Sequence, residues 1–304
     1  MADPVTAAPP TVRELIPAPH PDVAPLPPAA PREPGVRVLR GVPYGELPGS
    51  RPLELDLWLP GADASGPAPL VLFVHGGAWR RGRRDDMGMR MRDWAPGPFA
   101  RLAAAGLAVA CADYRLSGEA AFPAPLDDLR VALRWLTLRS AELGIDTGRT
   151  VVWGESAGGH LASLLALTPG PGVPAPVGAV VWYGPSDLTA PRAPFDPHDA
   201  GTPEALLLGA APAGCPDRAL AASPLAHAHA GAPPFLLVHG DADTMVSCTH
   251  SEALADALRS AGAPAELRVE PGADHGWHGL TDDRVADVFT HSLRFARRLV
   301  ARGN

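Results

Sequence analysis

The sequence predicts a single α/β domain in which helices flank a mostly parallel sheet of about eight strands. Segments with the pattern of strands alternate with helical segments along most of the chain, an order typical of parallel sheets with right-handed crossovers. The central strand-like segments are continuously apolar, as expected for strands buried on both faces. The chain has 304 residues, of which 46% are hydrophobic, so it is long enough to bury a sizeable core.

The first 35 residues contain eleven of the 37 prolines of the chain. Each proline removes a backbone hydrogen-bond donor and restricts the residue before it, so this stretch cannot sustain a helix or a central strand. We expect residues 1–35 to form an extended arm on the surface or to be disordered. The folded domain is therefore expected to comprise residues 36–304.

The domain is expected to begin with two strands, at residues 36–42 and 53–59, which alternate apolar and polar side chains and should pair antiparallel. Further strands are expected at residues 70–74, 107–114, 150–153, 177–183, 234–238 and 266–270. Helices are expected at residues 99–105, 123–144, 158–167, 252–261 and 284–301. Pro123 and Gly144 mark the start and the end of the second of these helices.

Residues 188–233 interrupt this alternation with a stretch rich in Pro, Ala, Gly and His, in which a helix is expected only near residues 203–208. A long irregular insert in a regular fold is usually a lid or the wall of a pocket. We expect a short cap or lid here.

The composition excludes several classes of protein. The formal net charge is −7, which argues against a nucleic-acid-binding protein because such proteins need a concentrated positive face. No run of about 18 apolar residues suggests a membrane span, and the first residues lack the pattern of a signal peptide. We therefore expect a soluble, cytoplasmic protein, and the sequence leaves its oligomeric state open.

The sequence also gives little reason to expect a metal or an organic cofactor. Cys111, Cys215 and Cys248 lack metal-ligand spacing and are too few for a disulfide framework. They favour a reducing compartment, although a bridge between Cys215 and Cys248 stays open. His227 and His229 have no carboxylate or cysteine partner at a suitable spacing, so we expect them to be surface or structural residues.

The strongest chemical signal is the segment Gly-Glu-Ser-Ala-Gly at residues 154–158. An expected strand precedes it and an expected helix follows it, so Ser156 should lie at the tip of a tight strand-to-helix turn. Gly154 and Gly158 provide the small neighbours that let the helix pack back on the strand. This context predicts that Ser156 is a nucleophile.

A serine hydroxyl needs a general base and a group that orients that base. In sites of this kind the acid follows the serine in the chain and the histidine comes last. Asp241 and Asp243 both follow the strand at residues 234–238, and we prefer Asp243 because it lies further into the loop. His275 follows the last strand among small residues and is preferred as the base over His278.

The oxyanion of an acyl-transfer reaction also needs backbone N–H donors. His75-Gly76-Gly77-Ala78-Trp79 directly follows the buried strand at residues 70–74, and its glycines allow the backbone to approach a substrate closely. We expect the N–H groups of Gly77 and Ala78, with Gly76 as a further candidate, to join that of Ala157. Trp79 and Trp277 lie beside these loops and could either wall the substrate pocket or pack in the core.

These motifs together resemble the α/β-hydrolase superfamily, and specifically the hormone-sensitive-lipase-like and BD-FAE-like carboxylesterases. The resemblance runs from about residue 53 to residue 299 and also covers the segment Asp113–Leu116 with Phe122, Pro123, Asp127 and Asp128. It implies an α/β-hydrolase fold, a site that this segment helps to wall, and hydrolysis of small to medium carboxylic esters through an acyl-enzyme without a cofactor.

Three positions depart from the lipase-like pattern. Ala78 replaces a third glycine, Glu155 stands where Asp is usual, and Ser247 stands where Pro is usual. The pattern favours the BD-FAE-like branch over triglyceride lipases. His-Gly-Gly-Ala-Trp is also similar to the motif of kynurenine formamidases, so an arylformamidase or another amide hydrolase is the main alternative. A hydrolase-fold protein that binds a ligand without catalysis is a weaker one.

Four arginines, Arg80, Arg81, Arg83 and Arg84, follow the oxyanion segment. We expect them to form a solvated face paired with Asp85 and Asp86. Binding of a substrate carboxylate is the alternative role.

Overall fold

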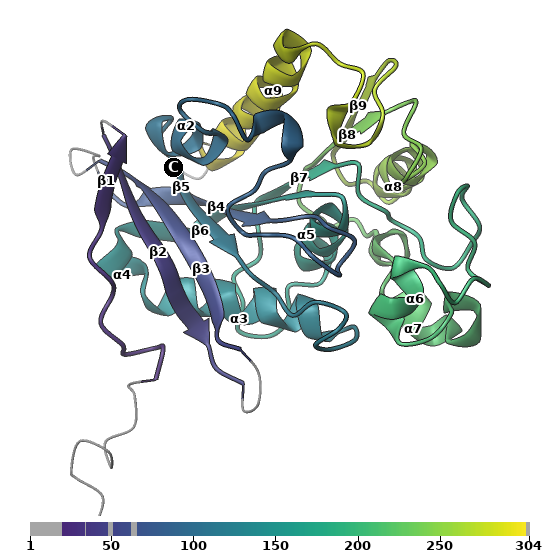
Figure 1. Ribbon diagram of the computed structural model, residues 1–304, viewed down its shortest axis with the longest axis horizontal. Helices are drawn as coiled ribbons and strands as arrows, with labels where there is room; N and C mark the ends of the chain where they lie inside the picture. The colour runs from purple at the N-terminus through teal and green to yellow at the C-terminus, as the bar shows by residue number, and fades with distance from the viewer. Residues whose placement is uncertain (1–19, 34, 48–50, 62–65, 302–304) are drawn as a thin grey trace, which may run out of the picture.

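The computed structural model describes residues 20–33, 35–47, 51–61 and 66–301 (Figure 1). Within these residues the strands form one nine-stranded sheet in the order β1-β2-β3-β5-β4-β6-β7-β8-β9. The strands are β1 Ala30–Glu33, β2 Val36–Gly45, β3 Leu53–Pro60, β4 Ala68–Val74, β5 Ala108–Ala112, β6 Ile145–Glu155, β7 Gly178–Trp182, β8 Phe235–Gly240 and β9 Ala265–Glu270.

The pairing divides the sheet into two parts. β1, β2 and β3 pair antiparallel, and β3 pairs antiparallel with β5. From β5 through β4, β6, β7 and β8 to β9, all neighbours are parallel. The loops that follow β4, β6, β8 and β9 therefore all emerge at the carboxyl ends of the parallel strands. This brings residues from distant parts of the chain together.

Helices cover both faces of the sheet (Figure 1). They are α2 Pro98–Ala104, α3 Ala124–Leu138, α4 Ser140–Leu143, α5 Ala157–Leu167, α6 Pro203–Leu208, α7 Pro216–Ala221, α8 Thr249–Ser260 and α9 Asp282–Ala301. Short 3₁₀ helices span Met89–Met91, Pro212–Gly214, Pro224–His227 and His275–Trp277. In the described part of the chain, no helix is both long and apolar enough to span a bilayer.

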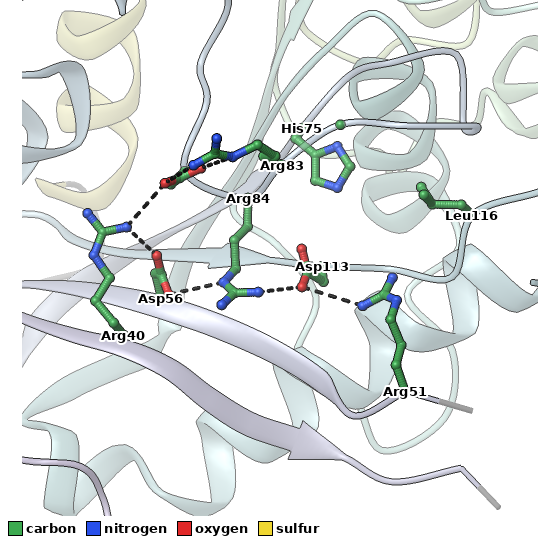
Figure 2. A pocket seen from close by; sticks show the side chains of 10 residues that line it. Arg40, Arg51, Asp56, His75, Arg83, Arg84, Asp113 and Leu116 are labelled. Atoms are coloured by element: carbon green, nitrogen blue, oxygen red, sulfur yellow. Dashed lines mark hydrogen bonds and ion pairs between the residues drawn. The ribbon is translucent and has the colours of Figure 1, made fainter. Parts of the chain in front are cut away.

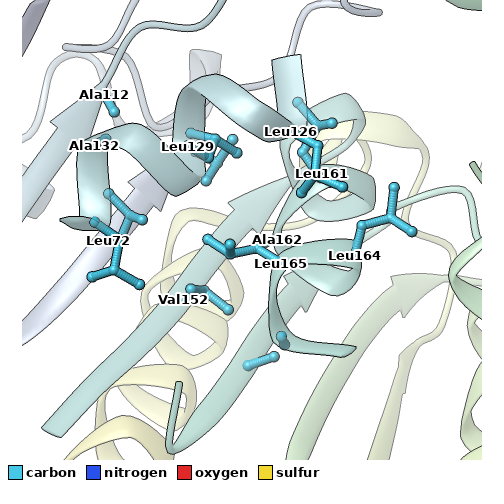
Figure 3. Close-up of a cluster of buried hydrophobic side chains, with 14 of the residues drawn as sticks. Leu72, Ala112, Leu126, Leu129, Ala132, Val152, Leu161, Ala162, Leu164 and Leu165 are labelled. Atoms are coloured by element: carbon cyan, nitrogen blue, oxygen red, sulfur yellow. The ribbon is translucent and has the colours of Figure 1, made fainter. Parts of the chain in front are cut away.

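The core lies in two layers, one on each side of the sheet. On one face, α3, α5 and α8 pack against side chains such as Leu72 and Val152, and Figure 3 shows Leu129 and Leu165 in this cluster. On the other face, α2 and α9 pack against the alternate residues of the same strands, including Phe73. The central strands are thus buried on both sides, which explains their continuously apolar sequence.

The structure confirms the expected α/β architecture. Each of the eight expected strands is present, and β1 adds a short ninth strand at the antiparallel edge. β1 falls in the proline-rich stretch that was expected to form an arm, and residues 1–19 of that stretch lie outside the described residues. The insert at residues 188–233 contains the expected helix α6 and also α7, which the sequence did not predict.

Candidate active site

Ser156 lies at the tip of a turn between β6, which ends at Glu155, and α5, which begins at Ala157. Its backbone has a positive φ of 53°, a strained conformation for a residue with a side chain. A Cβ at Gly154 would lie 2.2 Å from the carbonyl oxygen of Gly158, and one at Gly158 would lie 2.0 Å from that of Val74. Only glycines at these two positions allow so tight a turn.

The structure brings Ser156, His275 and Asp243 into contact. The Ser156 Oγ lies 3.0 Å from the Nε2 of His275, and the Nδ1 of His275 lies 2.7 Å from the Oδ2 of Asp243. These residues lie in the segments that follow β6, β9 and β8, and His275 begins the 3₁₀ helix after β9. The Asp243 side chain is only 1% exposed and that of His275 is 14% exposed, so His275 lies between the buried carboxyl group of Asp243 and the solvent.

The surroundings of Asp243 favour its charged form. Burial alone would raise the pKa of this carboxyl, but hydrogen bonds from His239 and His275 hold the pKa well below its usual value. The backbone N–H groups of Met245 and Val246 donate to its Oδ1 at 2.9 and 2.8 Å. An ionised carboxylate is the form that can accept the Nδ1–H of His275 and fix the orientation of its ring.

The rival candidates lie elsewhere. Asp241 is exposed, and its Oδ1 accepts the N–H of Gly272 at 2.7 Å. His278 is exposed, and its carbonyl oxygen accepts the N–H of Asp274 at 2.8 Å. Asp274 joins the two loops, because its Oδ1 accepts the backbone N–H groups of both Thr244 and His275 at 2.7 Å.

The segment of residues 75–84 follows β4 and is here called the oxyanion loop, after the role predicted for it from the sequence. Within the described residues, the N–H groups of Gly77, Ala78 and Ala157 have no protein acceptor. Gly77 and Ala78 both have positive φ, of 111° and 55°. A Cβ at Gly77 would lie 2.1 Å from the carbonyl oxygen of Arg81, so the loop can close in this way only because residue 77 is a glycine.

The structure corrects the expectation for Gly76. The N–H of Gly76 donates to the Oε1 of Glu155 at 2.8 Å, so this N–H is not available to an oxyanion. Burial raises the pKa of the Glu155 carboxyl above its usual value, although the Gly76 N–H and the nearby His275 act in the opposite direction. Glu155 therefore links the oxyanion loop to the turn that carries Ser156.

Trp79 and Trp277 are core residues and do not wall the cleft, which corrects the pocket-wall interpretation. Both are almost fully buried. The Nε1–H of Trp79 donates to the Nδ1 of His160 at 3.2 Å, and the Nε2–H of His160 donates to the carbonyl oxygen of Ala222. Trp277 packs edge-to-face on Trp182 and Tyr183, with ring centroids 5.5 and 4.7 Å apart.

A network of ion pairs lies behind the oxyanion loop. Figure 2 shows Arg40, Asp56, Arg84, Asp113 and Arg51 in a row along a cavity of about 500 Å³. Arg84 pairs with Asp56 at 3.0 Å, with Glu54 at 2.9 Å and with Asp113. Arg84 was expected to pair with Asp85 and Asp86 on a solvated face, and this was wrong, because its half-buried side chain pairs with two residues of β3 and with Asp113, which follows β5.

The segment at residues 113–116 packs against the start of the oxyanion loop. The hydroxyl of Tyr114 donates to the carbonyl oxygen of His75 at 3.0 Å, and the two rings stack with centroids 4.4 Å apart. Arg115 forms a bidentate ion pair with the buried Asp128 at the start of α3. This segment therefore contributes packing and anchoring behind the site.

A cleft of about 500 Å³ opens beside His275, with Gly77, Ala78, Arg81, Met89 and Met245 in its lining. Met89 and Met245 are 52% and 59% exposed, so the rim has an apolar component. Tyr183 lies under His275, with ring centroids 4.7 Å apart. The cleft is large enough for a small or medium organic molecule.

Three residues of the site were not predicted as part of it: Glu155 as an anchor of the loop, Asp274 and Tyr183. Glu155 and Asp274 each lie next to a predicted catalytic residue, which was the available signal.

All three cysteines are free, so no bridge joins Cys215 to Cys248. Among the described residues, no three His, Cys, Asp or Glu side chains gather as they would to hold a metal ion.

Comparisons with known proteins agree with this fold. The chain resembles the solved structure titled as a truncated carbohydrate esterase from gut microbiota, with a TM-score of 0.75 and 25% identity over 87% of this chain and 96% of that one. It also resembles the thermophilic esterase Est2 of Thermogutta terrifontis, with a TM-score of 0.68 and 27% identity over 89% and 93% of the chains. These likenesses place the chain in the α/β-hydrolase superfamily.

The chain belongs to the BD-FAE family, whose model matches residues 55–258. The model of the prolyl oligopeptidase family matches residues 214–303. Among curated relatives from Mycobacterium tuberculosis, LipM, named a probable carboxylic ester hydrolase, is 31% identical over 81% of this chain, and the esterase LipQ is 32% identical over 86%. The chain spans 57% and 63% of the length of these two relatives.

Proposed function

We propose that the protein is a serine hydrolase of small to medium carboxylic esters. Ser156 is the nucleophile, His275 the general base and Asp243 the residue that orients His275. The N–H groups of Gly77, Ala78 and Ala157 form the oxyanion hole. The observation that carries the proposal is the unbroken chain of contacts from Ser156 to His275 at 3.0 Å and from His275 to Asp243 at 2.7 Å.

The reaction follows from these contacts. The Oγ of Ser156 attacks the ester carbonyl while the Nε2 of His275 takes the proton of the hydroxyl. The resulting oxyanion accepts hydrogen bonds from the three N–H groups. The protonated His275 then gives its proton to the leaving alcohol, which departs and leaves an acyl-enzyme. Water, activated by the same histidine, releases the acid and restores Ser156. The proposed reaction requires neither a metal ion nor an organic cofactor.

Several observations support an ester as the substrate. The curated relatives and solved structures described above are named as esterases or as a carboxylic ester hydrolase. The volume of the cleft, about 500 Å³, suits acyl and alcohol groups of modest size. A cytoplasmic location remains part of the proposal, and the free cysteines are consistent with it.

The experiment that tests the proposal compares the wild type with Ser156→Ala. We expect a fluorophosphonate probe to label the wild type only, and nitrophenyl esters of short chains to be hydrolysed by the wild type only. Unchanged circular dichroism and melting temperature would show that the variant is folded. Ester turnover by the folded variant would overturn the assignment of the nucleophile.

The same assay separates the alternative substrates. The panel also contains feruloyl and acetyl-sugar esters, N-formylkynurenine and an aminoacyl amide. Because the prolyl oligopeptidase model matches residues 214–303, the aminoacyl amide is a necessary member. A higher kcat/KM for the formyl amide or the aminoacyl amide than for each ester would replace the ester proposal by an amidase.

A further inference from the structure

Arg81 occupies a special position on the oxyanion loop. Its backbone N–H donates to the carbonyl oxygen of Gly77 at 3.1 Å. Its own carbonyl oxygen lies so close to Gly77 that a Cβ there would approach it to 2.1 Å. The side chain of Arg81 is exposed and lines the cleft beside His275. A guanidinium is therefore carried by the residue that packs directly on a proposed oxyanion donor.

The other arginines that line the cleft are already neutralised. Arg83 forms two hydrogen bonds of 3.0 Å with Asp85, and Arg92 is held by Asp86, with an Nε–Oδ2 distance of 2.9 Å. Within the residues that the structure describes, Arg81 has neither an ion pair nor a side-chain hydrogen bond. Its five N–H donors are free for a ligand.

The carboxyl groups of Glu155 and Asp274, which also line the cleft, do not pair with Arg81. Glu155 is turned inward, where it accepts the N–H of Gly76 at 2.8 Å. Asp274 accepts the backbone N–H groups of Thr244 and His275 and the hydroxyl of Thr244. Both carboxyl groups are thus engaged by hydrogen-bond donors, and among the described arginines in the lining of the cleft the guanidinium of Arg81 is the one without a charged partner.

We propose that Arg81 binds a carboxylate of the substrate, and that the enzyme prefers monoesters of short dicarboxylic acids, with the free carboxylate on the acyl side. This inference rests on the proposed ester hydrolysis at Ser156. A guanidinium meets a carboxylate through two parallel N–H···O bonds, which would fix the acyl chain while its ester carbonyl faces Gly77. Met89 and Met245 at the rim would contact the methylene groups between the two ends.

The test compares monoethyl glutarate and monoethyl adipate with the ethyl esters of the corresponding monoamides, which have the same shape and leaving group but no charge. Product acids are quantified by chromatography. We expect wild-type kcat/KM to favour the charged ester about tenfold or more, and Arg81→Gln to lower kcat/KM for it by about 10- to 100-fold while changing that for the amide less than about threefold. The wild-type preference should also shrink as the salt concentration rises.

Arg80→Gln is the matched control, because Arg80 is exposed on the same loop but does not line the cleft. We expect it to keep the wild-type preference. Equal turnover of charged and neutral esters by the wild type would overturn the proposal, as would an equal loss on both in Arg81→Gln or the same effect from Arg80→Gln.

A second measurement does not depend on turnover. Calorimetry of Ser156→Ala with monoethyl adipate should show binding that weakens about tenfold or more when Arg81→Gln is added. If Arg81→Gln weakens the binding of monoethyl adipate but the wild type hydrolyses no ester, the proposed function is contradicted. Arg81 is then a carboxylate-binding residue in a protein with another activity. Turnover of neutral esters without a charge preference would contradict only the role of Arg81.

Discussion

The backbone N–H of Gly76 donates to the carboxyl group of Glu155 at 2.8 Å, although the two residues lie 79 positions apart in the chain. Gly76 follows β4 and Glu155 is the last residue of β6, and these two strands are neighbours in the sheet, with Val74 opposite Gly154. The bond therefore connects the segment that is proposed to stabilise the oxyanion with the turn that carries the proposed nucleophile. Glu155 therefore adds a side-chain contact to the strand pairing that already holds the two segments side by side.

Glu155→Ala should lower kcat/KM for a short nitrophenyl ester by about 10- to 100-fold, because the Gly76 N–H loses its acceptor and the oxyanion loop its anchor. Glu155→Gln keeps an acceptor oxygen of similar reach and should remain within about threefold of the wild type. Steady-state kinetics of both variants decide the matter. Wild-type rates for Glu155→Ala would show that the loop holds its position without this bond.

Asp243→Asn should lower kcat by about 10³- to 10⁴-fold, because an amide favours the wrong tautomer of His275. Asp241→Asn is the control of equal size and should change kcat less than about threefold, since Asp241 contacts the backbone of Gly272 at 2.7 Å. A larger loss in Asp241→Asn than in Asp243→Asn would reverse the assignment of the acid.

Gly77→Ala should lower kcat/KM by at least about 100-fold, because the new Cβ would lie 2.1 Å from the carbonyl oxygen of Arg81 and force the loop to move. Gly262 also has a positive φ, of 89°, but a Cβ there meets no atom within 4 Å. Gly262→Ala should therefore cost only about 1–2 kcal/mol of backbone strain and leave kcat/KM unchanged. Full activity in Gly77→Ala would exclude this residue from the oxyanion hole.

Acid should destabilise the protein through His160. Burial lowers the pKa of His160 to about 4, against a usual value of 6.5. Between these two pH values the unfolded chain binds a proton that the folded protein does not, so the free energy of unfolding falls as the pH decreases. The loss should approach about 3 kcal/mol near pH 4 and be absent above about pH 7.

Urea unfolding at pH 7.5, 5.5 and 4.5 measures this dependence. His160→Gln lacks the titrating group while keeping a donor and an acceptor for Ala222 and Trp79. Its free energy of unfolding should fall less steeply with decreasing pH than that of the wild type. Parallel curves for the two proteins would assign the acid sensitivity to other groups.

Much of the fold could be predicted because its signals are local. Strands buried on both faces, such as β4 and β7, have continuously apolar sequences, and α9 shows a helical pattern of apolar residues. β1 was not predicted because two prolines border or occupy it. A proline is tolerated only where its missing N–H faces away from a partner strand, and the edge position of β1 provides that environment.

For the site, the sequence predicted which residues would lie together but not the directions of backbone N–H groups and side chains. The sequence indicated which three residues would meet, because the order of the strands brings their loops to one edge, and their catalytic roles stay a prediction. Gly76 was included among the donors because the direction of a backbone N–H cannot be read from a sequence. The two tryptophans were ambiguous for a similar reason: an apolar side chain beside a catalytic loop can turn toward the core or toward the cleft.

The insert at residues 188–233 leaves the sheet after β7 and returns before β8, and none of Ser156, Asp243 and His275 belongs to it. One of its contacts with α5, the helix that follows Ser156, is the carbonyl oxygen of Ala222, which accepts the N–H of His160. This contact uses a main-chain atom, so it depends on the path of the backbone at Ala222 and not on the side chain there, whereas Leu188 and Leu207 of the insert pack in the core through their side chains. No residue of the insert lines the cleft beside His275, so the length and composition of this stretch can change between relatives while the lining of the cleft stays the same.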